Sequence, residues 1–264
     1  MKANEQRSRF GNFQFCIDLG LNADQTAISD HQRLSDLTTE LFSLFAEHQV
    51  PATWAPSFTM ADRVAELIKG SNVAHELALL GQAEWIGDSA RREHVVQSLG
   101  EHLRSAEKFE LPITSIVLRD SGGDVHHDLF AKNGIRVIRQ PLDRKLQPKA
   151  TRDPVVTRKG AWYVEASAKL PSTGMILGRF DVGYRGKQVL RRSLKRRAAE
   201  HLAISATELL ANPKFMKPLA QIVRHAARLQ SAGRIRCETL AGSVARMQPN
   251  ETVLTPQRSI LRAA

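Results

Sequence analysis

Hydrophobic positions along the chain form short apolar runs that alternate with longer amphipathic segments. The short runs predict strands, over residues 13–20, 50–57, 73–79, 113–119, 135–140, 161–170 and 201–205. The amphipathic segments repeat apolar residues at helical spacing and predict helices, over residues 35–48, 60–70, 89–109, 126–134, 186–200 and 215–233. A last strand and helix are expected within 235–247. Strands that alternate with helices are typical of a parallel sheet with crossover helices.

The segment 35–48 illustrates how the boundaries are assigned. Leu37, Leu41 and Phe45 fall on one helical face, and Ser35 is a residue type that caps helix starts. The pattern therefore predicts a helix that begins next to Ser35 and packs its apolar face on the sheet.

Two architectures fit this alternation, a (β/α) barrel and a doubly wound sheet. No GxGxxG follows the first strand, so the phosphate-binding turn of a dinucleotide fold is missing. Residues 141–160 are polar, basic and rich in Pro, which predicts an extended loop. Both architectures place functional side chains at the carboxyl ends of strands. The residues at these ends are Asp18, Trp54, His75, Glu76, Arg119 and those that close the strand 201–205.

Several stretches at these ends resemble motifs of the polysaccharide deacetylase (NodB-homology, carbohydrate esterase) family. CIDLG (16–20) resembles the motif TFDDG, and HELALLGQAEW (75–85) resembles HEIASHGYSHP. ITSIVLRDSGG (113–123) is similar to the strand that carries the family's arginine, and EHLAISA (200–206) resembles FHLWFHP. The resemblance implies an α/β fold, a single distorted (β/α)7 barrel over residues 12–247. Residues 1–11 would form an N-terminal extension and 248–264 a C-terminal tail.

The resemblance also implies a chemistry. Family members hydrolyse the amide of an N-acetylated sugar with a divalent metal such as zinc, which polarises the carbonyl and activates water. The first Asp of TFDDG is the base, and the second Asp and two His hold the metal. On this chain Asp18 takes the base position, whereas Leu19, Leu80 and Glu84 take the three ligand positions, and Ser205 takes that of the general-acid His. Leucine cannot coordinate a metal and one carboxylate does not make a zinc site, so we expect no metal cofactor.

The remaining candidates each have a functional and a structural interpretation. Asp18 and Arg119 occupy catalytic positions of the family, or Asp18 caps a turn and pairs with Arg119. Trp54 either stacks on a sugar or packs in the core, and His75 either contacts a substrate or is a packed, hydrogen-bonded histidine. The predicted substrate contacts are Trp54, His75, Glu84 and His201.

The charge of the chain adds a further candidate. The 264 residues have a formal net charge of +11. The first 100 residues contain 8 Lys and Arg against 13 Asp and Glu, and the remainder contains 30 against 14. Residues 184–197, YRGKQVLRRSLKRR, contain seven basic residues and no acidic one. Such a stretch binds acidic glycans or other acidic polymers, or it is a solvated helix face.

The sequence gives limited information on the cellular compartment and the oligomeric state of the protein. No apolar run approaches the roughly 20 residues that span a bilayer, and the first 15 residues lack the apolar core of a secretory signal. We therefore expect a cytoplasmic protein without a membrane span, in which Cys16 and Cys237 are reduced core residues. A homo-oligomer is compatible with the sequence.

Three functions remain open. The first is a deacetylase-like barrel that has lost metal-dependent deacetylation and binds a glycan or a protein partner. The second is an active carbohydrate hydrolase or deacetylase with a rebuilt site around Asp18, His75 and Glu84, to which Glu76 and His201 could contribute. The third is a polyanion-binding module that uses residues 184–197, ranked last because no motif that reads RNA or DNA is present.

Overall fold

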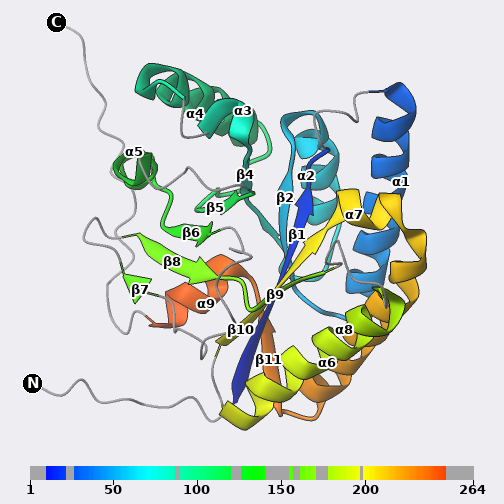
Figure 1. The fold of residues 1–264 in the computed structure, drawn as a ribbon. Coiled ribbons are helices and arrows are strands. Elements are labelled where there is room, and N and C mark those ends of the chain that lie inside the picture. The colour runs from blue at the N-terminus through cyan, green and yellow to red at the C-terminus, as the bar shows by residue number, and fades with distance from the viewer. Residues whose placement is uncertain are drawn as a thin grey trace, which may run out of the picture.

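The computed structural model describes residues 10–21, 27–86, 90–119, 126–140, 155–156, 161–170, 178–196 and 199–247 (Figure 1). Its strands are β1 (Gly11–Leu19), β2 (Thr53–Pro56), β3 (Glu76–Leu77), β4 (Leu79–Gly81), β5 (Ser115–Leu118), β6 (Val137–Gln140), β7 (Val155–Val156), β8 (Trp162–Glu165), β9 (Ala168–Leu170), β10 (Ala199–Ser205) and β11 (Ile235–Glu238). Its α-helices are α1 (Ile28–Glu47), α2 (Ala61–Lys69), α3 (Ala83–Ile86), α4 (Arg92–Glu107), α5 (His127–Lys132), α6 (Gly178–Arg196), α7 (Ala206–Ala211), α8 (Met216–Ser231) and α9 (Leu240–Met247). Short 3-10 helices cover Phe58–Met60 (η1) and Pro213–Phe215 (η3).

Seven parallel segments pair into a closed ring. One sheet runs β3-β2-β1-β10-β9 and the other β4-β5-β6-β8-β7. The segment 76–81 joins the two sheets, because β3 pairs with β2 and β4 pairs with β5. The segment 162–170 joins them again, because β8 pairs with β6 and β9 pairs with β10. The expected distorted (β/α)7 barrel is thus confirmed. β11 pairs with the first residues of β1, and β7 pairs antiparallel with β8.

The alternation of side chains along β1 separates two layers of core. Phe13, Phe15 and Ile17 belong to the large cluster between the strands and helices α1, α2 and α8. Cys16 belongs to a smaller cluster with Ala55, Leu80 and Val117 on the opposite face of the strands, inside the ring. Since successive side chains point to opposite faces of a strand, Asp18 also faces the interior. In Figure 1, α1, α6, α7 and α8 lie on one side of the barrel and α3, α4 and α5 on the other.

Two helix starts differ from the sequence prediction. α1 begins at Ile28, well before Ser35, because Leu34 is fully buried and extends the apolar face toward the N-terminus. α6 begins at Gly178 instead of residue 186, since Gly186 lies inside the helix where it packs closely against Ile222 of α8. In both cases a residue typical of a boundary lies within the helix, because tertiary packing decides its position.

The carboxylate of Glu76 connects four elements at the opposite end of the barrel from Arg119. It accepts hydrogen bonds from Thr53 Oγ1 on β2 (2.8 Å), from the Ser115 hydroxyl on β5 and from Ala241 N on α9 (3.1 Å). Burial raises its pKa above the usual value, although these three donors oppose that shift. Thr53, Glu76 and Ser115 each begin their strand, so this network fixes the amino ends of the strands.

Two smaller expectations can also be compared with the structure. Cys16 and Cys237 are both buried and unpaired, as expected, and burial raises the pKa of each thiol to about 12. Among the described helices, none is long and apolar enough to cross a membrane. The proposed extension and tail, like most of the loop 141–160, lie outside the described residues.

Candidate functional site

The carboxyl ends of β1, β4, β5 and β10 meet at one end of the barrel, which we call the mouth. Asp18 is in register with Ser205 on β10 and with Ala55 on β2. Arg119 follows β5 directly, and its backbone N–H donates to Gly81 O at the end of β4 (2.9 Å). The parallel pairing therefore brings Asp18, Leu80, Arg119 and Ser205 to the same end of the ring, as the sequence predicted.

The guanidinium of Arg119 contacts Asp18, Leu21 and Thr207 among the described residues of the mouth. Its Nε lies 3.7 Å from Asp18 Oδ2, its Nη1 donates to Leu21 O (2.8 Å) and its Nη2 donates to Thr207 Oγ1 (3.1 Å). The side chains of Asp18 and Arg119 are only 8% and 13% exposed, so solvent screens this ion pair weakly. These contacts, which we call the Arg119 network, tie the end of β1 to the end of β5 and the start of α7.

Asp18 and Thr207 also fix the backbone turn that follows β1. Asp18 Oδ1 accepts a hydrogen bond from Gly20 N (3.0 Å), and the Thr207 hydroxyl donates to Gly20 O. Asp18 thus both caps a turn and pairs with Arg119. These are the two structural roles considered for it from the sequence.

Gly20 shows how closely the mouth is packed. A Cβ atom at this position would lie 2.7 Å from Leu80 Cδ2 and 2.8 Å from Arg119 Nη1. A methyl group of Leu80 therefore lies beside the guanidinium, on the position where the sequence resemblance places a metal-binding imidazole. A pocket of about 20 Å³ includes Leu80 but is lined otherwise by residues such as Phe58 of η1 and His102 of α4, and by neither Asp18 nor Arg119, so it is separate from the mouth.

Comparisons with known proteins identify the fold. No protein-family model matches the sequence, and no curated protein matches it. A candidate polysaccharide deacetylase from Mycobacterium smegmatis has a similar structure, with a TM-score of 0.69 and 15% identity, over 93% of this chain and 94% of that one. A second, from Pseudomonas aeruginosa PAO1, has a TM-score of 0.66 and 14% identity, over 89% of each chain. The structure of Puue allantoinase has a TM-score of 0.64 and 13% identity, over 92% and 91%.

The chain has the polysaccharide deacetylase fold. The likeness spans most of this chain and most of the first two deacetylases, so it concerns the whole barrel and not one βα unit. The order of the strand-end motifs, which carried the resemblance at the level of sequence, agrees with the order of the elements around the ring.

Two of the three positions where the sequence resemblance places metal ligands hold side chains that cannot bind a metal. Leu19 is fully buried in the large hydrophobic cluster, and Leu80 presents only carbon atoms at the mouth. Glu84 lies in α3, and its side chain is outside the described part of the structure. Among the described residues, no group of three or more His, Cys, Asp or Glu could hold a metal ion.

Trp54 does not reach the mouth. Its side chain is fully buried in the layer between barrel and helices, where its ring packs on Phe42 and Phe45 with centroids 5.1 and 5.7 Å apart. The neighbours of Trp54 on β2, Thr53 and Ala55, contact Glu76 and the interior cluster, so Trp54 faces outward. The position corrects the prediction of a sugar-stacking residue and supports the core-packing alternative.

His75 also lies away from the mouth, before the start of β3. Its Nδ1 accepts a hydrogen bond from Ala52 N (3.2 Å), and its ring packs on Phe42 and Trp54. Burial lowers its pKa to about 4, against the opposing effect of the Ala52 N–H. His75 is therefore a neutral histidine of the outer core, and this position corrects its assignment as a substrate contact.

His201 lies deep inside the barrel. It is 2% exposed and is in register with Gln14, four residues before the level of Asp18. Burial and the positive charge of Arg139 lower its pKa to about 3. At about 3.3 Å per strand residue this places His201 roughly 13 Å below the mouth, so its position also corrects the prediction of a ligand contact.

Sequence reasoning missed three residues of the interior. Thr207 lies in α7, a helix of only six residues that is too short to show helical periodicity. Gly20 was noted only as part of a motif. Arg139 is 4% exposed and lies near Cys16 and His201 inside the barrel. Arg139 comes two residues after the buried Val137 in a predicted strand, so the two side chains share a face of that strand. This alternation could have identified Arg139 as an interior residue.

Arg119→Ala is expected to destabilise the protein substantially. The substitution leaves Asp18 Oδ2, Leu21 O and Thr207 Oγ1 without their guanidinium partner in a poorly solvated site. We expect the free energy of unfolding to fall by about 2–4 kcal/mol, measured by urea denaturation. Arg92→Ala is the control, because Arg92 pairs with Asp128 on the exposed surface and should change stability little. Equal effects of the two substitutions would contradict the Arg119 network.

The two buried histidines should make the protein less stable in mild acid. Their folded pKa values, about 4 for His75 and about 3 for His201, lie below the unfolded value near 6.5. The unfolded chain therefore binds more protons as the pH falls below 6.5, and stability is lost in that direction. Between pH 6.5 and 5 the two together should lower the free energy of unfolding by about 3 kcal/mol.

Substitution of the two histidines separates their contribution to this loss of stability from that of the other titratable groups. His75→Asn with His201→Asn should reduce the slope of the free energy of unfolding against pH, even if stability at pH 7 is lower. An unchanged slope between pH 6.5 and 5 would show that these side chains are already protonated in the folded protein.

Proposed function

We propose that this protein is a divergent member of the polysaccharide deacetylase family that no longer performs metal-dependent deacetylation and that binds a glycan. The observation that carries the proposal is the chemistry of the mouth. Leu80 packs beside Arg119 on the metal-ligand side, and Asp18 is engaged by Arg119 and by the backbone of Gly20.

The loss of hydrolysis follows from what these groups can supply. In the family, a metal supplies activated water and polarises the amide carbonyl when bound. Without three ligands, the described residues of the mouth do not generate that nucleophile, since unactivated water has a pKa of about 15.7. Asp18 alone could accept a proton, but its carboxylate already holds the turn after β1 and the guanidinium. The residues at the mouth therefore support binding and not chemistry.

A rebuilt hydrolase site has less support. His75 packs in the outer core, Glu76 fixes the amino ends of the strands, and His201 lies below the mouth. These groups do not converge with Asp18 at one end of the barrel. His75, Glu76 and His201 therefore do not form one catalytic site with Asp18.

The glycan is supported by analogy of fold. Structures with this fold include a candidate glycoside hydrolase or deacetylase from Parabacteroides distasonis, with a TM-score of 0.57, and a CE4 esterase from Streptococcus mutans, with a TM-score of 0.53. Both are described as carbohydrate-active, so a carbohydrate is the ligand we infer for this mouth. The two buried, unpaired thiols favour a reducing compartment, which supports a cytoplasmic location.

Acetate release from N-acetylglucosamine oligomers tests the loss of activity. We expect release at the blank rate, with or without added zinc, cobalt or nickel, because the ligand positions hold leucines. An authentic deacetylase of the same fold serves as the positive control. Metal-dependent release above the blank, abolished in Asp18→Asn, would overturn this part of the proposal.

Binding of the same oligomers tests the retained role. We expect saturable one-to-one binding in calorimetry, weakened in Asp18→Asn, which keeps an oxygen for Gly20 N but loses the charge that holds Arg119. Lys132→Ala, an exposed substitution on α5, should leave the affinity unchanged. Absence of binding to N-acetylated and de-N-acetylated oligomers alike would remove the glycan from the proposal.

A further inference from the structure

The helices α6 and α8 approach each other closely through small residues. A Cβ atom at Gly186 of α6 would lie 2.2 Å from Ile222 Cδ1 of α8, and one at Gly183 would lie 3.7 Å from Pro218 Cβ. A larger side chain at position 186 would separate the helices. The glycine therefore permits a crossing that brings the basic face of α6 next to that of α8.

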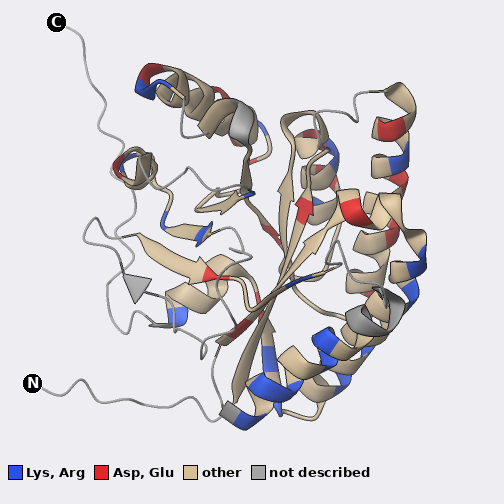
Figure 2. Cartoon of the chain, in the orientation of Figure 1, with Lys and Arg blue, Asp and Glu red and all other residues tan. Residues whose placement is uncertain are grey.

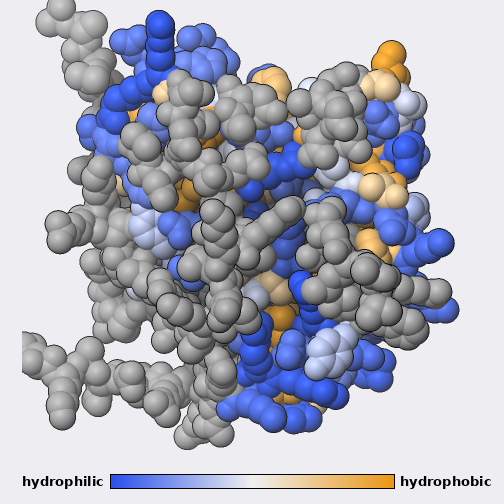
Figure 3. All heavy atoms as spheres, viewed as in Figure 1, coloured by the Kyte–Doolittle hydropathy of each residue, from blue (hydrophilic) through white to orange (hydrophobic). Residues whose placement is uncertain are grey.

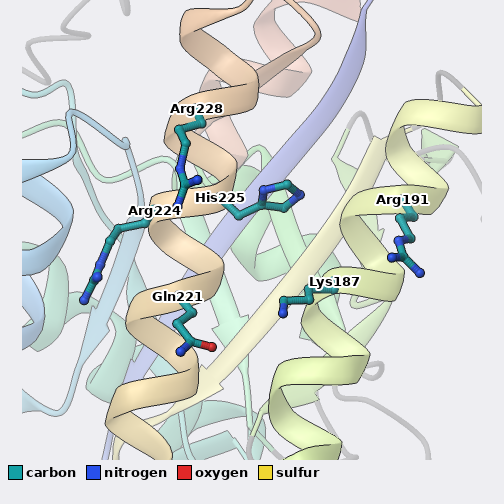
Figure 4. A pocket seen from close by; sticks show the side chains of 6 residues that line it. All are labelled: Lys187, Arg191, Gln221, Arg224, His225 and Arg228. Atoms are coloured by element: carbon teal, nitrogen blue, oxygen red, sulfur yellow. The ribbon is translucent and has the colours of Figure 1, made fainter.

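Beyond this crossing the two helices form a pocket of about 600 Å³ on the outer surface of the barrel. Lys187 and Arg191 line it from α6, and Gln221, Arg224, His225 and Arg228 line it from α8 (Figure 4). In this view Lys187 and His225 extend into the space between the helices, Arg191 lies on α6, Arg228 lies along the near side of α8, and Arg224 extends from the side of α8 that faces away from α6. We call this the α6–α8 pocket.

The positive charge of the α6–α8 pocket is not neutralised within the described part of the chain. Lys187, Arg191, Arg224 and Arg228 form no ion pair with a carboxylate there, whereas Arg192, the next residue on α6, pairs with buried Glu200 of β10 (3.3 Å). Figure 2 shows basic residues along α6 and α8, and the visible surface over α6 is mainly hydrophilic (Figure 3). Arg192 thus pairs with a buried group, whereas Lys187, Arg191, Arg224 and Arg228 are exposed and have no acidic partner among the described residues.

The pKa of His225 reflects the positive charges around the α6–α8 pocket. Burial lowers its pKa, and the positive charges of Arg228, Lys187, Arg191 and Arg234 lower it further. At neutral pH the imidazole is therefore uncharged and still has one N–H to donate. A bound anion would offset these charges and raise the pKa.

We propose that the α6–α8 pocket binds a small compound that carries two or more phosphate groups. Four cations, an imidazole and the Gln221 amide offer donors from two helices to one ligand. Arginine binds phosphate oxygens in a bidentate manner, and a phosphate group carries nearly two negative charges near neutral pH. The volume is that of a small-molecule site and exceeds what a single phosphate would fill. The site lies on the helices that cover the outside of the barrel, so it is independent of the mouth.

Calorimetry with inorganic tripolyphosphate tests this site on the full chain. We expect saturable one-to-one binding that weakens between about 50 and about 200 mM salt, because salt screens exposed charges. Lys187→Ala with Arg228→Ala, one residue from each helix, should weaken binding at least about tenfold. The matched control is Lys132→Ala with Arg136→Ala, which removes the same charge from the exposed surface around α5 and should weaken binding less than about twofold.

Two results would overturn the proposal. One is an equal loss of affinity in the two double variants, which would show that binding follows net charge alone. The other is binding confined to long-chain polyphosphate with several protein molecules per chain, which would indicate a polymer-coating surface instead of a pocket.

The imidazole of His225 gives a second measurement that does not depend on affinity. In a titration followed by NMR, tripolyphosphate should raise the pKa of His225, and affinity should therefore increase as the pH falls from 8 to 6. His225→Asn should remove that pH dependence. Binding that leaves the His225 resonance and its pKa unchanged would place the anion elsewhere and contradict the assignment.

Discussion

The guanidinium of Arg119 joins the carboxyl ends of β1 and β5 and the start of α7 through one ion pair and two hydrogen bonds. The same group lies against Gly20 and next to Leu80. A buried guanidinium needs acceptors on several sides, and here Asp18, Leu21 and Thr207 supply them. The position of Arg119 therefore determines the shape of the turn after β1, the orientation of Asp18 and the space left beside Leu80. Among the described residues, this cation and the backbone of Gly20 hold Asp18 in place.

The periodicity of the sequence predicted most strands and helices, because a parallel sheet with crossover helices leaves a strong periodic signal. It left a barrel and a doubly wound sheet open, and the barrel was implied by the resemblance to the polysaccharide deacetylase family. The sequence placed Asp18, Leu80, Arg119 and Ser205 at one mouth, since strand ends and motif order are linear properties. It did not predict the directions of side chains. Trp54 and His75 lie near strand ends, yet both face the outer core, because the alternation along β2 and β3 assigns Thr53 and Glu76 to the interior. His201 faces the interior but lies too far below the mouth to contact a ligand there. Only the register of β10 against β1 reveals this depth.

The interior of the barrel and its outer surface are organised by different electrostatic rules. Inside, the carboxyl groups of Glu76 and Asp18 are satisfied by hydroxyl, backbone and guanidinium donors, so both groups serve the fold. Outside, α6 and α8 place several cations around one pocket without acidic partners in the described chain. Because of this contrast, the basic stretch and the strand-end motifs need not serve the same function. α6 shows both patterns, since Arg192 pairs with the buried carboxylate of Glu200 whereas Lys187 and Arg191 face the pocket.

The metal content of the purified protein tests most directly whether the mouth has lost its metal site. The protein should be purified without chelators, dialysed and analysed for zinc, cobalt, nickel, iron and manganese. We predict far less than one equivalent of any of these metals, because Leu19 and Leu80 offer no lone pair at two of the three ligand positions. About one equivalent of a transition metal that survives dialysis, and that is lost when Asp18 is replaced, would contradict the account.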